Sequence, residues 1–270
     1  MRDRAFCWVK PSDASFAAVI DLTLDVYGAM TGAAMAAGFI DAIAGGGGLI
    51  SVPALLAAGI PPVAALATNK LQSSFSVAMA CYRYAKTGLI DFRGYAWTAA
   101  LVFIAAFLGA LAVQAVSNAV LGRIMPVLIV AVVAYVLMSP RMTDADSHER
   151  LGRRGFAPVA GIIGFYDGFF GPGAGSFYST TLVALRGMGL TRAAATTKLF
   201  NFTSNFAALI LFALGGHVLW VLGLVMALGG IAGAWIGSHV AIRFGARVIR
   251  PLLVTISLIL TGKLVWENFF

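Results

Sequence analysis

One polar pattern occurs twice in this chain, each time inside segments that are otherwise apolar. In each copy an acid is followed by a glycine-rich break and then by a lysine. The members are Asp41, glycines 45–48 and Lys70 in the first copy, and Asp167, the break at 171–175 and Lys198 in the second. The acids are offset by 126 residues and the lysines by 128, so two extra residues fall beside the glycine run. A duplicated membrane unit with interrupted apolar segments is typical of secondary transporters.

The chain is too apolar for a soluble protein of its length. Hydrophobic residues make up 60% of the 270 residues and charged residues only 11%, and a soluble domain could not hide that much apolar surface. The net charge of +8 lies mostly in short loops between apolar runs, where it indicates topology rather than nucleic-acid binding. Cys7 and Cys81 are too few for a disulfide framework. We therefore predict an all-α polytopic membrane protein that lies in a lipid bilayer and binds no nucleic acid.

The polar residues divide the chain into two membrane repeats. Residues 1–24 contain only a short apolar piece and are predicted to form a peripheral N-terminal tail. The first repeat is expected over 25–138, a charged cytoplasmic linker over 139–154 and the second repeat over 155–270. Each repeat should contain a glycine-broken segment and about three full spans, which gives roughly eight to ten membrane segments. The last span is expected at about 249–266.

The stretch after each glycine break is too short to cross a bilayer. Residues 49–59 number 11, or roughly 16 Å of helix against ~30 Å of hydrocarbon. Their counterpart is 177–185. Each stretch is predicted to be a half-helix or one arm of a re-entrant hairpin. Pro61 and Pro62 suit the start of the helix that carries Lys70, because a missing N–H costs little there.

The loop charges favour halves of opposite orientation. The loop at 83–93 is basic, whereas its counterpart at 215–217 has no lysine or arginine. Conversely, the turn at 186–192 is basic and its counterpart at 59–62 is uncharged. Equivalent loops of opposite charge indicate opposite sides of the membrane, which predicts inverted repeats. Arg123 lies in a loop that this scheme places outside, so a parallel duplication stays open.

The two lysines are the strongest candidates for function. A lysine in the middle of a membrane span is costly unless it faces water or a partner. Lys70 and Lys198 could form one anion site, or each could pair with an acid such as Asp41 or Asp167 and hold the helices together. The aspartates could in turn carry protons, since an intramembrane carboxylate beside a lysine is suited to proton coupling, or they could stabilise the broken backbone through a cap or salt bridge.

The glycine breaks and their neighbours complete the predicted site. A break frees backbone N–H groups at the start of a half-helix, and such ends bind anions; a flexible kink is the alternative. Neutral donors on the lysine helices suit sulfonate or sulfite oxygens, although interhelical hydrogen bonds would explain them equally well. Besides the lysines, the predicted substrate-binding residues are Gly46, Gly47, Gly48, Ser51, Asn69, Ser73, Gly173, Ala174, Gly175, Asn201 and Asn205.

Other features argue for packing and against an enzyme. Gly229, Gly233 and Gly237 form a stripe of small residues, which predicts close helix packing. The three histidines lie apart in the sequence and form no metal-binding motif, and the chain has no HExxH motif or nucleophile elbow. We therefore expect neither an enzyme nor a resident metal or cofactor.

Four motifs carry a resemblance to a known family: GGGGLISVP, ATNKLQS, GFYDGFFGPGAGSF and ATTKLFNFTSNF. In these the chain resembles the sulfite exporter TauE/SafE family of membrane transporters, from about residue 27 to residue 266. The resemblance implies a multi-pass permease of the bacterial cytoplasmic (inner) membrane for small sulfur-containing or organic anions, such as sulfite, sulfoacetate or other sulfonates. The family's positions fall on Asp41, glycines 45–48, Asn69 and Lys70, and on Asp167, Gly171, Gly173, Lys198, Asn201 and Asn205. The position equivalent to Asn69 in the second half is occupied by Thr197. The two halves therefore do not offer a bound anion identical side chains.

These features predict a secondary transporter of small anions that is coupled to protons. The anion would bind between the repeats, and rocking of one repeat against the other would alternate access. An anion channel lined by the same lysines is the main alternative, and a membrane assembly protein without transport is a third. Whether the chain forms a homodimer stays open.

Overall fold

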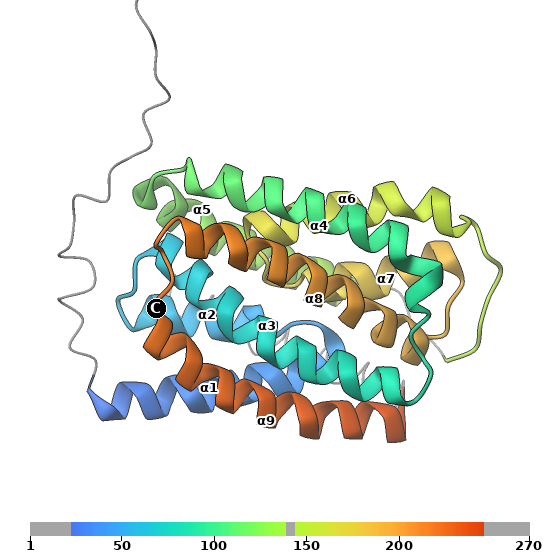
Figure 1. Cartoon of the computed structure of the whole chain (residues 1–270), viewed down its shortest axis with the longest axis horizontal. Helices are drawn as coiled ribbons and strands as arrows, with labels where there is room; N and C mark the ends of the chain where they lie inside the picture. Colours follow the sequence, from blue (N-terminus) through green and yellow to red (C-terminus); the bar gives the residue numbers. More distant parts are fainter. Residues whose placement is uncertain (1–22, 139–143, 246–270) are drawn as a thin grey trace, which may run out of the picture.

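The structure, a computed structural model, describes residues 23–138 and 144–245, and all regular structure in these ranges is α-helical (Figure 1). The predicted all-α class is therefore confirmed. The helices are α1 (Leu24–Ala44), α2 (Gly48–Ala57), α3 (Pro62–Lys86), α4 (Phe92–Gln114), α5 (Asn118–Met138), α6 (Arg153–Phe169), α7 (Ala174–Arg186), α8 (Leu190–Leu214) and α9 (Trp220–Phe244). Most of the expected N-terminal tail, the start of the linker and the last expected span fall outside the described residues.

Four of the described helices are long and apolar enough to cross a membrane, namely α1, α4, α8 and α9. The chain is therefore a multi-pass membrane protein. The two short helices after the glycine breaks are also present, as α2 with 10 residues and α7 with 13. α7 begins at Ala174, three residues before the expected start, because Gly173 at φ 81° ends the break and Ala174–Gly175–Ser176 already turn as helix. The basic loop at 83–93 is shorter than expected, because Arg83 and Lys86 form the last turn of α3.

The first helix of each half packs against the other half. α1, the first helix, packs most extensively against α9, and α6 packs in the same way against α4 (Figure 1). In each case the first helix of one half contacts the fourth helix of the other. Along the chain direction, α1, α3 and α9 run one way in Figure 1, and α4, α6 and α8 run the opposite way.

Glycines make both of these contacts close. A Cβ at Gly229, Gly233 or Gly237 of α9 would overlap backbone atoms of α1, so the predicted small-residue stripe is confirmed as helix packing. At the other contact, a Cβ at Gly168 of α6 would overlap the backbone of Ala106, and one at Gly109 of α4 would overlap the backbone of Phe165. Small residues of this kind let membrane helices approach closely.

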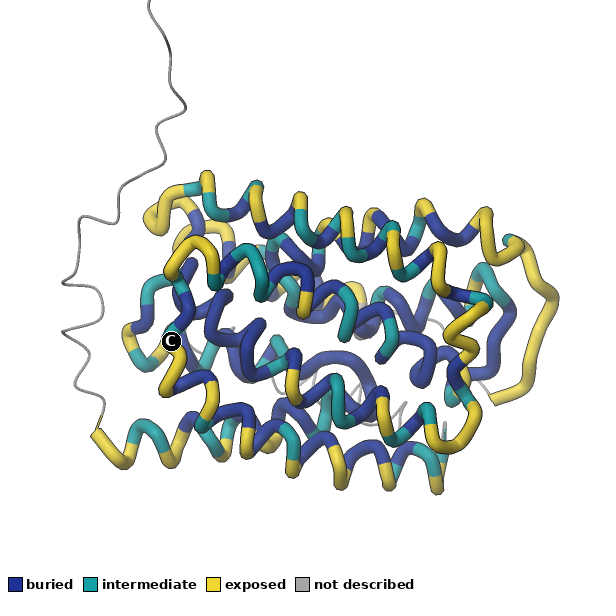
Figure 2. Tube along the Cα trace, viewed as in Figure 1, coloured by how far each residue is buried: buried dark blue, intermediate teal, exposed yellow. Residues whose placement is uncertain are grey.

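The burial pattern is apolar outside and polar at the centre. Figure 2 shows exposed residues along the outer faces of the bundle, and these include large apolar side chains such as Trp97, Ile162 and Leu228. In contrast, Asn69, Lys70 and Gln72 on α3 and Lys198, Asn201 and Ser204 on α8 are buried. An apolar surface suits lipid, while buried polar groups in a membrane protein mark a substrate or ion pathway.

Candidate functional site

The two glycine breaks meet in the middle of the molecule. Gly45 ends α1 in a left-handed conformation (φ 80°), and a Cβ built on it would lie 2.5 Å from the carbonyl carbon of Gly175. A Cβ on Gly175 would likewise lie 2.5 Å from the Cα of Gly45. Ser176 adds a hydrogen bond, with its Oγ donating to the carbonyl of Ala44 over 3.2 Å. Only residues without a side chain fit at this crossing.

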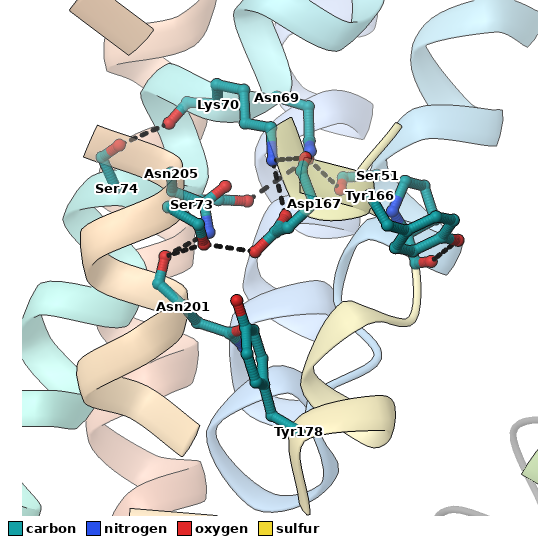
Figure 3. A network of polar contacts seen from close by, with 12 residues as sticks. Ser51, Asn69, Lys70, Ser73, Ser74, Tyr166, Asp167, Tyr178, Asn201 and Asn205 are labelled. Atoms are coloured by element: carbon teal, nitrogen blue, oxygen red, sulfur yellow. Dashed lines mark hydrogen bonds and ion pairs between the residues drawn. The ribbon is translucent and has the colours of Figure 1, made fainter. Parts of the chain in front are cut away.

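Lys70 pairs with Asp167 of the other half (Figure 3). Its Nζ donates to Asp167 Oδ1 over 2.7 Å and to the backbone carbonyl of Asp167 over 2.5 Å. Ser204 donates a short hydrogen bond to the second carboxylate oxygen, Oδ2. The side chains of Lys70 and Asp167 are only 1% and 3% exposed, so both carboxylate oxygens are held inside the protein.

Lys198 makes the reciprocal pair with Asp41. Its Nζ donates to the backbone carbonyl of Asp41, and it lies 3.4 Å from Asp41 Oδ2. The other carboxylate oxygen, Oδ1, accepts from the backbone N–H of Gly47 over 3.2 Å. The Asp41 side chain is 14% exposed. Each lysine therefore binds the aspartate of the opposite half.

The ammonium groups of Lys70 and Lys198 lie at the C-terminal ends of α6 and α1, respectively. Asp41 is in the last turn of α1 and Asp167 is in the last turn of α6. The free carbonyls at a helix C-terminus carry partial negative charge, so each ammonium is balanced by a carboxylate and by the end of a helix. In this conformation the lysines therefore pair with the aspartates, as in the second of the two roles predicted for them.

Side-chain hydrogen bonds at equivalent positions connect α2 to α3, which carries Lys70, and α7 to α8, which carries Lys198. Ser51 Oγ of α2 donates to Asn69 Oδ1 over 2.5 Å, and Ser179 of α7 lies 3.0 Å from Thr197 Oγ1 in a hydroxyl pair. Both pairs shift by 128 residues between the halves, and each ends one residue before the lysine. The sequence analysis matched Thr197 to Asn69 but selected neither Thr197 nor Ser179 as a site residue, although the offset of the lysines also relates Ser179 to Ser51.

A small polar pocket lies between the breaks. Its volume is about 20 Å³, which is room for about one water molecule. A larger anion could bind in this pocket only if side chains or helices moved. The predicted site residues that line it are Asp41, Gly48, Asn69, Lys70, Ser73, Asp167, Gly173, Ala174, Gly175, Asn201 and Asn205.

Four predicted site residues do not line this pocket: Gly46, Gly47, Ser51 and Lys198. Lys198 is connected to it through Asp41, and the N–H of Gly47 is used by the carboxylate of Asp41. The pocket wall also contains Gly45, Val77 and Gly171, and Ser204 reaches it through Asp167. Ser204 was one of several polar residues on its helix, and its bond to Asp167 depends on how α6 and α8 pack.

Asn201 presents an unused acceptor at the pocket. The residue is 3% exposed, and its Oδ1 is buried without a hydrogen-bond partner in the described part of the chain. Its backbone carbonyl accepts from Asn205 Nδ2 over 2.7 Å (Figure 3). Within 23–138 and 144–245, no three His, Cys, Asp or Glu side chains come together as a metal site.

The helical bundle, its apolar surface and its buried, charge-paired breaks define a membrane protein of the transporter class. Residues 30–264 match the family model described as Sulfite exporter TauE/SafE, and the chain belongs to this family of membrane transporters.

Relatives extend over nearly the whole chain. It is 43% identical over 236 residues to the probable membrane transporter protein YfcA of Escherichia coli (strain K12), covering 87% of this chain and 88% of the relative. It is 41% identical over 250 residues to a probable membrane transporter protein of Haemophilus influenzae, covering 92% and 98%. A third relative, the probable membrane transporter protein ORF9 of a Sinorhizobium species, is 44% identical over 245 residues, covering 90% and 94%. These names indicate a transporter and not an enzyme. No solved structure matches the chain.

Proposed function

We propose that the protein is a proton-coupled secondary transporter of small sulfur-containing or organic anions, such as sulfite, sulfoacetate or other sulfonates. The anion would bind at the central pocket, and the protein would act in a bacterial inner membrane. The observation that carries this proposal is the pair of crossed, buried Lys–Asp contacts at the glycine breaks. The family name supports the assignment to anion transport, and the names of the relatives support membrane transport.

The charge balance of the site supports coupling to protons. Lys70, Lys198, Asp41 and Asp167 are all mostly buried, and with both lysines protonated and both aspartates ionised their charges sum to zero. A monoanion would leave one uncompensated negative charge inside the protein, which is costly. One proton on an aspartate restores neutrality and frees its lysine for the anion. The site therefore favours movement of one proton with each negative charge.

Asp41 is the better candidate for the proton carrier. Both aspartates line the pocket, but the side chain of Asp41 is more exposed than that of Asp167 and lies farther from its lysine. Asp167 is held by both Lys70 and Ser204. Protonation of Asp41 would release Lys198 toward a substrate anion, with the donors of Asn69, Ser73 and Asn205 nearby.

We also propose that the halves are inverted repeats that rock against each other. The reciprocal packing of α1 on α9 and of α6 on α4 supports this, together with the opposite directions of α1 and α6 in Figure 1. The repeats would span 25–138 and 155–270, with the linker 139–154 on the cytoplasmic side. The Gly45–Gly175 crossing would be a pivot, since a close backbone contact can slide without displacing side chains.

Flux into liposomes tests the proposal. Purified protein is reconstituted, and uptake of sulfite, sulfoacetate and ethanesulfonate is followed with and without an imposed pH gradient. We expect saturable uptake that follows the gradient, and an Asp41→Asn variant that has lost the pH dependence. Ser76→Ala serves as a matched control, because Ser76 is buried on α3 outside the pocket lining. Conductive flux without proton dependence would instead establish a channel, and no flux of these anions would refute the substrate class.

A further inference from the structure

A second cavity lies at one end of the bundle, between the linker, the α3–α4 loop and the α7–α8 turn. Its volume is about 470 Å³, so it has ample space for a small anion. Three arginines from three different elements line it: Arg153 of α6, Arg186 of α7 and Arg192 of α8. We call this the linker cavity.

Every arginine of the linker cavity is paired with an acid. Arg153 lies 2.7 Å from Asp91, Arg192 lies 3.1 Å from Asp146, and Arg186 makes a short contact with Glu149. The Arg186 side chain is only 8% exposed and also donates to the carbonyl of Leu151 over 2.5 Å. Buried guanidinium groups need an anion beside them, and their planar donors suit carboxylates and other oxyanions.

Two of the three acids are carried by the linker. Asp146 and Glu149 are 54% and 52% exposed. Their side chains can therefore turn into solvent while the linker backbone stays attached, although Asp146 would give up the bond that it accepts from the Gly189 N–H over 2.8 Å. That attachment is made by Ser147, whose N–H donates to Gly187 over 2.8 Å, and by Leu151, whose N–H donates to Leu185 over 2.8 Å. The Arg192–Asp146 pair is half-exposed on both sides and such pairs contribute little stability, so another oxyanion can compete with this carboxylate.

The linker cavity and the central site both involve residues of α8. Thr196 of α8 lines the cavity, and Lys198 follows two residues later, about 3 Å along the helix axis.

We propose that the linker cavity is a second anion site, where a small oxyanion such as a sulfonate binds the guanidinium groups of Arg192 and Arg186 in place of the linker carboxylates. This proposal rests on the proposed function in one respect: during transport an anion would occupy the linker cavity before or after it occupies the central pocket. Asp146 and Glu149 act as internal competitors for the same arginines.

A fluorescent reporter on the cavity wall tests binding directly. Ser147 is exposed and lines the cavity, so a Ser147→Cys variant can carry an environment-sensitive dye in a Cys7→Ser background, with the buried Cys81 left in place. Ethanesulfonate is titrated into the labelled full-length protein in detergent. We expect a saturable change in fluorescence.

Matched charge variants decide which groups bind the probe. Arg192→Gln should weaken ethanesulfonate binding about tenfold or more, because a charge-assisted contact is lost. Asp146→Asn should tighten binding several-fold, since the amide can still accept from the Gly189 N–H but no longer competes for Arg192. Arg150→Gln is the control, because it removes a positive charge from the same linker outside the cavity lining. Equal affinities in all three variants would overturn the site.

Two further arms distinguish the linker cavity from a lipid-binding site and from the central pocket. Phosphatidylglycerol micelles replace ethanesulfonate in the first arm, and a response to the lipid alone would overturn the sulfonate assignment. Flux is measured in the second arm, where Arg192→Gln should raise the half-saturating concentration with little loss of maximal rate. Flux with no reporter response refutes the linker cavity and leaves the proposed function standing. A reporter response without flux in the wild type refutes the transport proposal and leaves the cavity standing.

Discussion

The two lysine–aspartate pairs occupy equivalent positions in the two halves, yet they are held differently. Lys70 and Asp167 are 1% and 3% exposed, and Ser204 binds the second oxygen of the carboxylate. Lys198 is equally buried, but Asp41 is 14% exposed and lies 3.4 Å from the ammonium group. Besides Lys198, its carboxylate accepts only the backbone N–H of Gly47 among the described residues. Asp41, Lys70 and Asp167 all line the pocket, but the carboxylate of Asp167 is enclosed by protein groups whereas that of Asp41 is partly exposed. This difference favours separate roles for the two pairs. The first pair would hold the halves together, and the contact between Lys198 and Asp41 would break and re-form during transport.

Removing the enclosed carboxylate should have the largest effect. Asp167→Asn leaves Lys70 buried without its counter-ion, and we expect a loss of about 3–5 kcal/mol in the free energy of unfolding. Asp41→Asn should cost clearly less, because its carboxylate is farther from Lys198 and partly exposed. The two variants are heated in detergent, and the fraction that stays folded is measured by size-exclusion chromatography. The shift in unfolding temperature relative to the wild type is then compared between the variants.

A double variant separates the stability of the enclosed pair from its role in transport. Lys70→Met with Asp167→Leu replaces the ion pair by apolar groups, which usually restores stability. We expect a folded protein without anion uptake. Equal destabilisation by Asp41→Asn and Asp167→Asn would show that the two pairs are not distinct.

The glycine crossing should be the next most sensitive point. Gly175→Ala places a methyl group 2.5 Å from the Cα of Gly45, where two backbones meet and neither can rotate away. We expect a loss of about 1–3 kcal/mol, as for an overpacked core. Gly46→Ala is the matched control, because the nearest atom to its new Cβ is a leucine side-chain carbon at 3.7 Å. Unfolding midpoints measured side by side test this, and similar values for the two variants would contradict a tight crossing.

The sequence predicted the elements of this site better than their connections. The repeated acid–glycine–lysine pattern correctly predicted two short helices after two breaks, because glycine runs and helix length depend on local sequence. Which lysine meets which aspartate could not be derived, since a repeat is equally consistent with contacts within and between its copies. The bond from Ser204 to Asp167 was missed for the same reason: it joins α8 to α6, and only their packing brings the two residues together.

Ser204 allows a finer test of why the two pairs differ. Ser204→Ala leaves Asp167 Oδ2 without its donor, and we expect a loss of about 1.5–3 kcal/mol in the free energy of unfolding, the range for a hydrogen bond to a charged group. Its equivalent in the first half is Ser76, which is as buried but makes no bond to Asp41 in the described ranges. Ser76→Ala should therefore have a much smaller effect on the unfolding midpoint. If the two alanine variants matched, the hydroxyl would not be what distinguishes the pairs.

The smallest expected difference lies at the helix starts of the two halves. α4 begins after Asp91, whose carboxylate accepts from the Gly94 N–H over 2.8 Å, whereas Leu219 before α9 provides no side-chain cap. The Gly94 N–H, together with the nearby Arg153 guanidinium, holds the pKa of Asp91 below its ordinary value of 3.8. The ionised form is thus favoured in the folded protein. Its contribution to stability is present above pH 3.8 and is lost as the pH falls through the lower pKa of the folded state.

Asp91→Asn tests this contribution, because asparagine can still cap a helix but carries no charge. The variant should unfold at a slightly lower temperature than the wild type at pH 7. The gap should begin to close as the pH falls below 3.8, and it should vanish as the pH falls through the lower pKa of the folded state, where the wild-type carboxylate also loses its charge. Unfolding midpoints between pH 7 and pH 3 measure the gap. Asp25→Asn, an exposed change of the same kind in the first turn of α1, is the control. A gap that stays constant over this range would mean that the charge of Asp91 adds nothing to its capping bond, and that the two helix starts differ by the cap alone.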